Sequence, residues 1–136
     1  VACIVSLVKE YGGIQFILNL IKSRISGRRG GELGIAGLSL LVDACTANNT
    51  VAIVMAGPIA KEICEEFDID PKRSASLLDI FTSVGQGLIP YGAQLLSAAT
   101  LTALTPFEII PYLYYPILMA ISAICFILFR KERKRM

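Results

Sequence analysis

Two long apolar runs constrain this chain most strongly, because each contains one carboxylate beside a polar patch that disfavours a continuous helix. In residues 33–60 the single charged residue is Asp43, and in residues 74–107 it is Asp79. An ionised carboxylate at bilayer depth is costly and normally faces a cavity, a partner or an ion path. Irregular backbone at that depth is tolerated only where protein or a water-filled site satisfies it. Two interruptions of this kind are typical of the binding site of a secondary transporter.

The composition favours a membrane protein over a small soluble domain. Apolar residues make up 54% of the 136 residues. Residues 109–129 carry no charge over 21 positions, which is long enough to cross ~30 Å of hydrocarbon. We therefore expect an all-α, polytopic membrane protein. Because the chain starts at Val1 within an apolar stretch, we read it as the C-terminal part of a longer transporter, with a complete small membrane protein as the alternative.

Charge and hydropathy patterns divide the chain into six segments. Isoleucines and leucines recur at helical spacing within residues 11–26, which favours an amphipathic helix in the membrane interface over a short tilted crossing. In chain order we expect the end of a membrane helix at 1–8, an interfacial helix at 11–26, a re-entrant hairpin at 33–60, a broken transmembrane helix at 71–104, a last transmembrane helix at 109–129 and a cytoplasmic tail at 130–136.

The charges around residues 33–60 favour a hairpin over a crossing. Lys and Arg residues occur both before and after this run, and basic residues near membrane ends mark the cytoplasmic side. A hairpin that enters and returns on one side satisfies both clusters, whereas the alternative, one broken crossing, does not. The polar tip at 46–50 lies near the middle of the run, so each limb would have ~10–12 residues and a length of ~15–18 Å.

The second run begins with a strong helix start and ends in helix breakers. Asp70 suits the N-cap position, and Pro71 suits the first helical position. A polar stripe follows at helical spacing, formed by Ser76, Asp79, Thr82, Ser83 and Gln86. We expect four residues to break the helix: Gly85, Gly87, Pro90 and Gly92. A kinked helix that packs closely through its small residues is the alternative.

The polar residues of the two interruptions could together bind a desolvated cation. Broken helices expose carbonyl groups, and their C-terminal ends add a negative dipole. We expect Asp43, Asn49 and Asp79 to hold a transported sodium ion, and one of the two acids to exchange it for a proton. The full set of predicted ion- or substrate-binding residues is Asp43, Thr46, Asn48, Asn49, Thr50, Asp79, Ser83, Gln86 and Gln94.

Other classes of function find little support in the sequence. The chain has no His, and its four cysteines stand singly, so neither a zinc site nor a disulfide framework is indicated. No nucleophile–base pair or phosphate loop points to an enzyme, and no cofactor is expected. The basic tail at 130–136 lacks interleaved aromatic residues, which argues against a nucleic-acid partner.

At these residues the chain resembles the NhaC-type sodium/proton antiporter family. Four stretches carry the resemblance: LVDACTANNTVAIV at 41–54, GPIA at 57–60, DPKRSASLLDIF at 70–81 and QGLIPYGAQLL at 86–96. The resemblance implies the C-terminal half of an exchanger in the cytoplasmic membrane. The basic residues at 130–136 separately predict a C-terminus in the cytoplasm. The NhaC-type family is itself similar to a wider group of transporters built from inverted repeats with re-entrant hairpins.

The resemblance leaves the substrate open. Family members are associated with exchange of sodium for protons and with exchange of small organic anions such as malate and lactate. A non-transporting helical membrane subunit is a further alternative. The implied partners are the sodium ion, the proton, the lipid bilayer and the N-terminal half of the transporter. Assembly as a homodimer stays open.

Overall fold

The computed structural model describes residues 27–129 continuously. Before them it describes only residues 7, 10–12, 16, 19–20 and 23. Apart from these positions, the expected membrane-helix end at 1–8 and the interfacial helix at 11–26 lie outside the described residues. The cytoplasmic tail at 130–136 also lies outside them.

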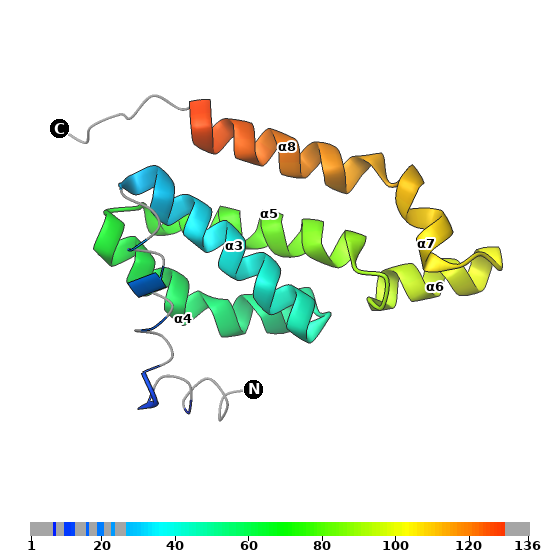
Figure 1. Ribbon diagram of the computed structural model, residues 1–136, viewed down its shortest axis with the longest axis horizontal. Helices are drawn as coiled ribbons and strands as arrows, with labels where there is room; N and C mark the ends of the chain where they lie inside the picture. The colour runs from blue at the N-terminus through cyan, green and yellow to red at the C-terminus, as the bar shows by residue number, and fades with distance from the viewer. Residues whose placement is uncertain are drawn as a thin grey trace.

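The described part of the chain folds into helices and connecting turns, without a strand, which confirms the all-α fold class. In chain order the elements are α3 (Arg28–Thr46), α4 (Asn49–Phe67), α5 (Pro71–Leu88), α6 (Ala93–Thr102), α7 (Pro106–Ile109), the 3-10 helix η1 (Ile110–Tyr112) and α8 (Tyr114–Phe129). Helices α3, α4 and α5 pack against one another, and α8 returns along α5 (Figure 1). Helices α6 and α7 extend beyond the end of α5.

Helices α3 and α4 form a hairpin that turns at Ala47 and Asn48. Ala47 adopts the left-handed conformation, with φ 49°, and its N–H donates to the carbonyl of Asp43 at 2.7 Å. The side chain of Asn48 then accepts a hydrogen bond from the N–H of Val51 at 3.2 Å. A left-handed C-cap followed at once by an asparagine N-cap ends one helix and begins the next. The sequence interruption at 46–50 is therefore a tight turn between two helices.

Each limb of this hairpin is longer than the apolar run alone suggests. Both α3 and α4 have 19 residues, so each is ~28 Å long rather than ~15–18 Å. The helical turns beyond the apolar run 33–60 are polar in sequence, but core packing and an ion pair stabilise them as helix. Ile63 and Cys64 of α4 are buried in the core, and Glu32 of α3 forms an ion pair with Arg73 of α5. The helices therefore continue past the ends of the apolar run.

Helix α5 begins as its sequence predicts. The side chain of Asp70 accepts a hydrogen bond from the N–H of Lys72 at 3.0 Å, and Pro71 is the first helical residue. The helix lies between the hairpin and α8, and its buried side chains Leu77, Leu78 and Phe81 belong to the main hydrophobic core. This position brings α5 into contact with both interruptions.

Helix α5 ends where Pro90 removes a backbone donor. Residues 89–92 form a turn in which the N–H of Gly92 donates to the carbonyl of Ile89 at 3.0 Å. Of the four predicted helix breakers, Pro90 and Gly92 lie in this turn, whereas Gly85 and Gly87 remain inside α5. Both of those helical glycines instead permit close contacts with other helices.

The segment after this turn bends sharply. Within the described residues, no single helix is both long and apolar enough to cross a bilayer. One bent pair, Pro71–Thr102 with Pro106–Tyr112 at an angle of 93°, meets the requirement by length and composition. The expected crossing at 109–129 is divided, because η1 and Leu113 separate its start from the 16-residue apolar helix α8.

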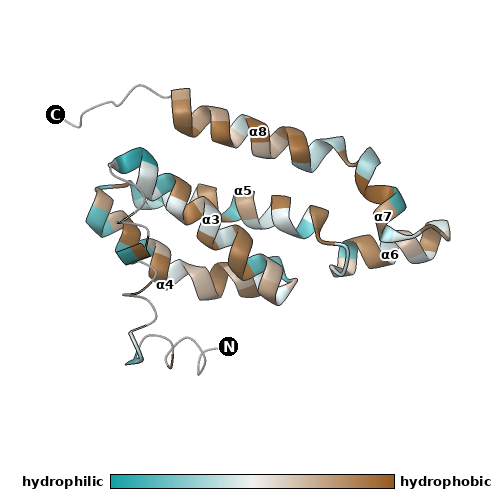
Figure 2. Ribbon diagram, in the orientation of Figure 1, coloured by the Kyte–Doolittle hydropathy of each residue, from teal (hydrophilic) through white to brown (hydrophobic). Residues whose placement is uncertain are grey.

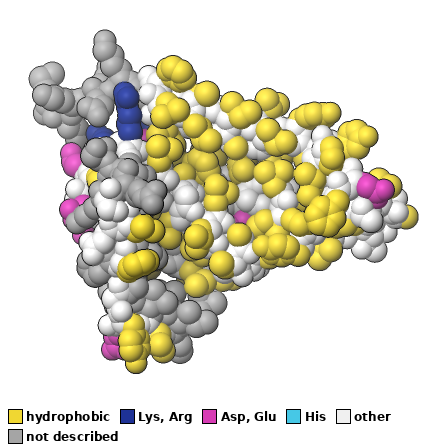
Figure 3. Space-filling model, viewed as in Figure 1, with side chains coloured by type: hydrophobic (Ala, Val, Ile, Leu, Met, Phe, Trp, Pro, Cys, Tyr) yellow, Lys and Arg dark blue, Asp and Glu magenta, His cyan; other side chains and the backbone are white. Residues whose placement is uncertain are grey.

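Charged residues gather at one end of the helix bundle. This end is formed by the starts of α3 and α5 and the ends of α4 and α8, and hydrophilic residues are concentrated there (Figure 2). The face shown in Figure 3 is covered mainly by hydrophobic side chains, with most of its charged side chains at the same end. The basic residues that flank the apolar run 33–60, Arg28 and Lys61, lie beside one cavity at this end.

Candidate functional site

Asp43 is the most unusual side chain near the hairpin turn. It lies in the last turn of α3, and its exposed fraction is 0%. Neither of its carboxylate oxygens has a hydrogen-bond partner among the described residues. Buried carboxylates are normally paired or hydrogen-bonded, because an isolated buried charge is very costly. Asp43 is therefore a buried acid whose carboxylate the described side chains leave unpaired.

Gly85 of α5 provides the space in which this carboxylate lies. A Cβ atom added to Gly85 would be 2.5 Å from Oδ2 of Asp43 and 3.3 Å from Leu40. Real Cβ atoms do not approach other atoms this closely, so any larger residue would displace the carboxylate. Asp43 thus packs directly against the backbone of a neighbouring helix.

Asn49, at the start of α4, contacts the same face of α5. The hydroxyl of Thr82 donates to Oδ1 of Asn49 at 2.7 Å, and Nδ2 of Asn49 donates to the hydroxyl of Ser83 at 3.3 Å. The Thr82 hydroxyl also lies 2.7 Å from the carbonyl of Leu78. A hydroxyl has one proton, so Thr82 serves one of these acceptors at a time. When it serves Leu78, both lone pairs of the Asn49 amide oxygen are free of Thr82.

The two halves of this site are adjacent along α5. Thr82 and Gly85 are three residues apart and both are buried, so they share one helix face with ~5–6 Å between their positions. Asp43 contacts Gly85, and Asn49 contacts Thr82. The hairpin turn therefore brings a carboxylate and an amide against one segment of α5, which itself carries the hydroxyl groups of Thr82 and Ser83.

The α5–α6 turn lies beside the hairpin turn. The hydroxyl of Tyr91 donates to the backbone carbonyl of Ala44 at 2.6 Å. Four helix ends consequently meet here: the C-termini of α3 and α5 and the N-termini of α4 and α6. Helix C-termini carry partial negative charge and N-termini carry partial positive charge, so the dipoles of these four ends offset one another. The described residues contain no group of three or more His, Cys, Asp or Glu side chains that could hold a resident metal ion.

A comparison with protein families identifies the chain. A family model described as the Na+/H+ antiporter family matches residues 2–131. The chain belongs to the Na+/H+ antiporter family. No curated protein and no solved structure matches the chain significantly.

Family membership defines the function in general terms. The Na+/H+ antiporters are membrane transporters, and they are not known as a family of enzymes. At this general level, membership indicates ion transport in which sodium ions are exchanged for protons. The buried, unpaired carboxylate at the hairpin turn fits a protein that handles cations.

The remaining predicted site residues lie at various places around this site. Asn48 is exposed and caps α4. The half-buried Thr46 donates to the carbonyl of Val42 at 3.0 Å, within its own helix. Thr50, Asp79 and Gln94 are exposed, and Gln86 is half-buried.

Asp79 is not brought beside Asp43. It lies six residues before Gly85, or ~9 Å along the axis of α5, and on an exposed side of that helix. The polar stripe of α5 therefore divides between two environments. Thr82 faces the hairpin, whereas Asp79 faces away from the packed helices.

Two residues of the site, Thr82 and Tyr91, were not among the predicted ion-binding residues. Thr82 belongs to the polar stripe, but its contact with Asn49 depends on how α4 packs against α5. Tyr91 lies between two predicted helix breakers, and its bond to Ala44 joins segments 47 residues apart. The usable sequence signal in both cases is a hydroxyl group close to a predicted interruption.

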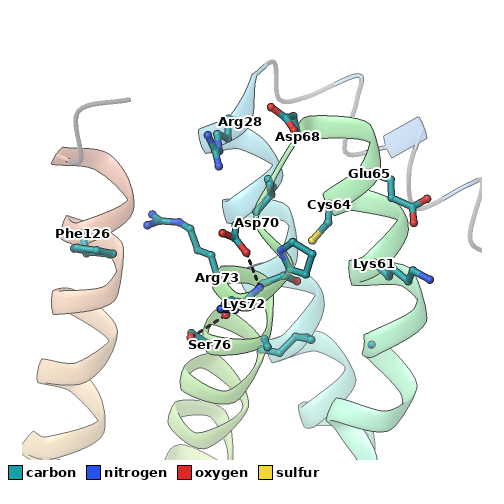
Figure 4. A pocket seen from close by; sticks show the side chains of 16 residues that line it. Arg28, Lys61, Cys64, Glu65, Asp68, Asp70, Lys72, Arg73, Ser76 and Phe126 are labelled. Carbon is teal, nitrogen blue, oxygen red and sulfur yellow. Dashed lines mark hydrogen bonds between the residues drawn. The ribbon is translucent and has the colours of Figure 1, made fainter. Parts of the chain in front are cut away.

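A cavity of about 900 Å³ lies at the other, charged end of the bundle. Figure 4 shows Arg73 extending from α5 toward Phe126 of α8, with Arg28 of α3 nearby. The guanidinium lies 4.9 Å from the centre of the Phe126 ring. Arg73 is twelve residues before Gly85, or ~18 Å along α5. This cavity is therefore separate from the site at Asp43.

Proposed function

We propose that this family member exchanges sodium ions for protons at Asp43. The observation that carries the proposal is a fully buried carboxylate with no hydrogen-bond partner among the described residues. Burial favours the neutral form of such an acid, and a nearby cation favours the charged form. A proton and a sodium ion would thus compete for one carboxylate, and this competition couples their movements in opposite directions.

The groups around Asp43 suit a sodium ion. The amide oxygen of Asn49 and the hydroxyl groups of Thr82 and Ser83 are hard oxygen ligands, as small hard cations prefer. The carboxylate of Asp43 supplies the negative charge that a cation requires. In this proposal the sodium ion binds between the hairpin turn and the Thr82–Gly85 segment of α5.

We further propose that the α3–α4 hairpin is re-entrant. Its support is that Arg28 and Lys61, which flank the apolar run 33–60, lie at one end of the bundle, as expected for a hairpin that returns to its starting side. Asp43 lies fifteen residues after Arg28, or ~22 Å along α3, well within a hydrocarbon layer of ~30 Å. The end of α8 is at the same charged end, which favours a cytoplasmic C-terminus.

The NhaC subtype is also a proposal, and it rests on the four sequence stretches that resemble that family. Some members of the subtype are associated with malate or lactate. The closest ion-paired arginine, Arg73, is ~18 Å from the Asp43 contact along α5, so it offers no counter-charge for an organic anion at the proposed site. Sodium is therefore the better-supported substrate.

The decisive experiment is transport by the full-length protein in liposomes, measured as sodium uptake and proton release. The substitution Asp43→Asn keeps the shape of the side chain but removes its charge, so exchange should fall to the level of protein-free vesicles. Lowering the pH should raise the KM of the wild type for sodium, by at most about tenfold per pH unit for one competing proton. The maximal rate should stay constant.

Two acids provide matched controls. Glu108 is exposed and accepts hydrogen bonds from the N–H and hydroxyl of Thr105, both at 2.8 Å, so Glu108→Gln should exchange at the wild-type rate. Asp79→Asn should keep measurable exchange because Asp79 is exposed. Wild-type exchange by a folded Asp43→Asn protein would refute the proposal. A sodium flux that requires malate or lactate would identify an organic-anion carrier instead.

A further inference from the structure

The α5–α6 turn presents one side chain to the hairpin. In this turn Ile89 supplies the carbonyl, Pro90 occupies the first central position, and Gly92 supplies the N–H. Proline is favoured at the first central position because its φ is already suitable. Tyr91 occupies the second central position, and the residue is 55% exposed although its hydroxyl is hydrogen-bonded. The turn thus fixes the base of a side chain that reaches across to α3.

The acceptor of the Tyr91 hydroxyl lies one residue after Asp43. Ala44 is in the last turn of α3, where backbone carbonyls lack the usual partners within the helix. The carbonyl of Asp43 is satisfied by the N–H of Ala47, and that of Ala44 is satisfied by the Tyr91 hydroxyl. Tyr91 therefore caps α3 from another segment of the chain, at the turn that carries the buried carboxylate.

The segment that follows Tyr91 is weakly attached to the bundle. In α6 only Leu95 is buried, and this helix packs mainly against α5 and α7. The bond from Tyr91 to Ala44 therefore links a weakly packed arm to the end of α3. This hydrogen bond fixes the distance between the α5–α6 turn and the last turn of α3.

We propose that the Tyr91 hydroxyl is a latch between the two helix interruptions, which holds the last turn of α3, and with it Asp43, in position for the ion. The latch rests on the proposed sodium/proton exchange. Tyr91 acts through Ala44 and is thus a positioning residue. Loss of the hydroxyl leaves the fold and the ligand side chains intact, but it allows the last turn of α3, which carries Asp43, to open.

The test removes only the oxygen atom, with Tyr91→Phe, and compares it with Tyr112→Phe. Tyr112 is 75% exposed, and its hydroxyl makes no hydrogen bond to a described residue, so it is a matched control. The first readout is the KM for sodium in full-length protein in liposomes. A single hydrogen bond changes an equilibrium roughly two- to tenfold, so Tyr91→Phe should raise this KM by that factor. A purely structural role would lower the yield or the thermal stability without changing the KM.

The second readout needs no transport. Cys45 is exposed and directly follows Ala44, so its labelling rate by a small maleimide reports on the last turn of α3. The background carries Cys3→Ala, Cys64→Ala and Cys125→Ala, and any cysteine elsewhere in the full-length protein is also replaced by alanine. We expect Cys45 to react roughly two- to tenfold faster in Tyr91→Phe than in the background, and at an unchanged rate in Tyr112→Phe.

The outcomes separate the latch from the function on which it rests. Equal labelling rates of Cys45 with and without the Tyr91 hydroxyl overturn the latch, whatever the protein transports. Faster labelling with an unchanged KM for sodium overturns its role in positioning the ion site. A wild-type protein without sodium/proton exchange refutes the proposed function instead, and the difference in labelling then shows a tether with no ion to position.

Discussion

Two buried carboxylates lie on α3, and their surroundings differ completely. Glu32, 4% exposed, accepts a 2.7 Å hydrogen bond from Nη2 of Arg73 and forms an ion pair with it. The Arg73 guanidinium in turn lies over the ring of Phe126. Asp43, 0% exposed, has no hydrogen-bond donor among the described residues and packs against Gly85. One helix thus carries one satisfied and one unsatisfied acid.

The same neighbour, α5, produces both environments. It presents an arginine to the acid at the charged end and a glycine to the acid at the hairpin turn. A paired buried acid joins α3, α5 and α8 into one bundle, whereas an unpaired one costs stability unless an ion or proton accompanies it. The comparison indicates structural support for Glu32, and it is the basis for proposing ion chemistry at Asp43.

The largest expected effect comes from breaking the paired acid. Glu32→Gln leaves Arg73 buried without its counter-charge, and removal of one partner of a buried pair costs about 3–5 kcal/mol. Arg73 is 13% exposed at its side chain, so the lower end of this range applies. Asp43→Asn removes an unpaired charge and should leave the stability unchanged or raise it. Chemical unfolding of both variants in the same detergent measures the difference.

A double variant distinguishes pairing from packing at the charged end. Glu32→Gln combined with Arg73→Met removes both charges and keeps most of the side-chain volume. It should recover much of the lost stability, because an apolar replacement of a buried pair is often neutral. If Glu32→Gln proves no less stable than Asp43→Asn, the contrast between the two acids is wrong.

A smaller effect should separate the two helical glycines of α5. Gly85→Ala places a Cβ 2.5 Å from the Asp43 carboxylate, whereas Gly87→Ala places one 3.0 Å from Pro116 on α8. Overpacking of this kind costs about 1–3 kcal/mol, and alanine returns up to about 1 kcal/mol of helix propensity at both sites. Gly85→Ala should therefore reduce the rate of sodium/proton exchange by a larger fraction than it reduces the free energy of unfolding. Gly87→Ala should change both quantities only slightly.

The matched readouts are the KM for sodium and the unfolding midpoint of each glycine variant. A raised KM in Gly85→Ala alone would locate the ion beside this glycine. Equal effects of the two substitutions on the KM would mean that Gly85 serves only helix packing.

Local features of the fold were readable from the sequence. The cap at Asp70 and Pro71 is confirmed, because these residue types suit unsatisfied amide groups wherever a helix begins. The interruption at 46–50 also lies where its polar residues predict it, and Asn48 caps the following helix. Pro90 and Gly92 lie in the second interruption. Such signals are local, so one sequence is sufficient to find them.

The contacts that Glu32, Asp43 and Asp79 make or lack in the folded structure could not be predicted from the sequence in the same way. Spacing places Asp79 and Thr82 on one polar stripe, but only packing decides which part of the stripe the hairpin covers. A glycine gives no sign of which neighbour will approach it, so Gly85 was expected as a helix breaker. Glu32 and Arg73 are 41 residues apart and each resembles an ordinary end of an apolar run. These contacts depend on tertiary structure.

The smallest effect is expected at the two residues with a left-handed backbone that flank α4, one before the helix and one after it. Ala47 has φ 49° at the hairpin turn, and Asp68 has φ 51° at the charged end. Glycine has no Cβ penalty in this conformation, which costs alanine about 1–2 kcal/mol, while aspartate tolerates it better. Ala47→Gly should therefore raise the free energy of unfolding by up to about 1 kcal/mol, and Asp68→Gly by less. If the left-handed conformation of Ala47 also keeps the ion site in its geometry, Ala47→Gly alone should raise the KM for sodium. An equal KM in both variants would mean that this conformation affects only the turn.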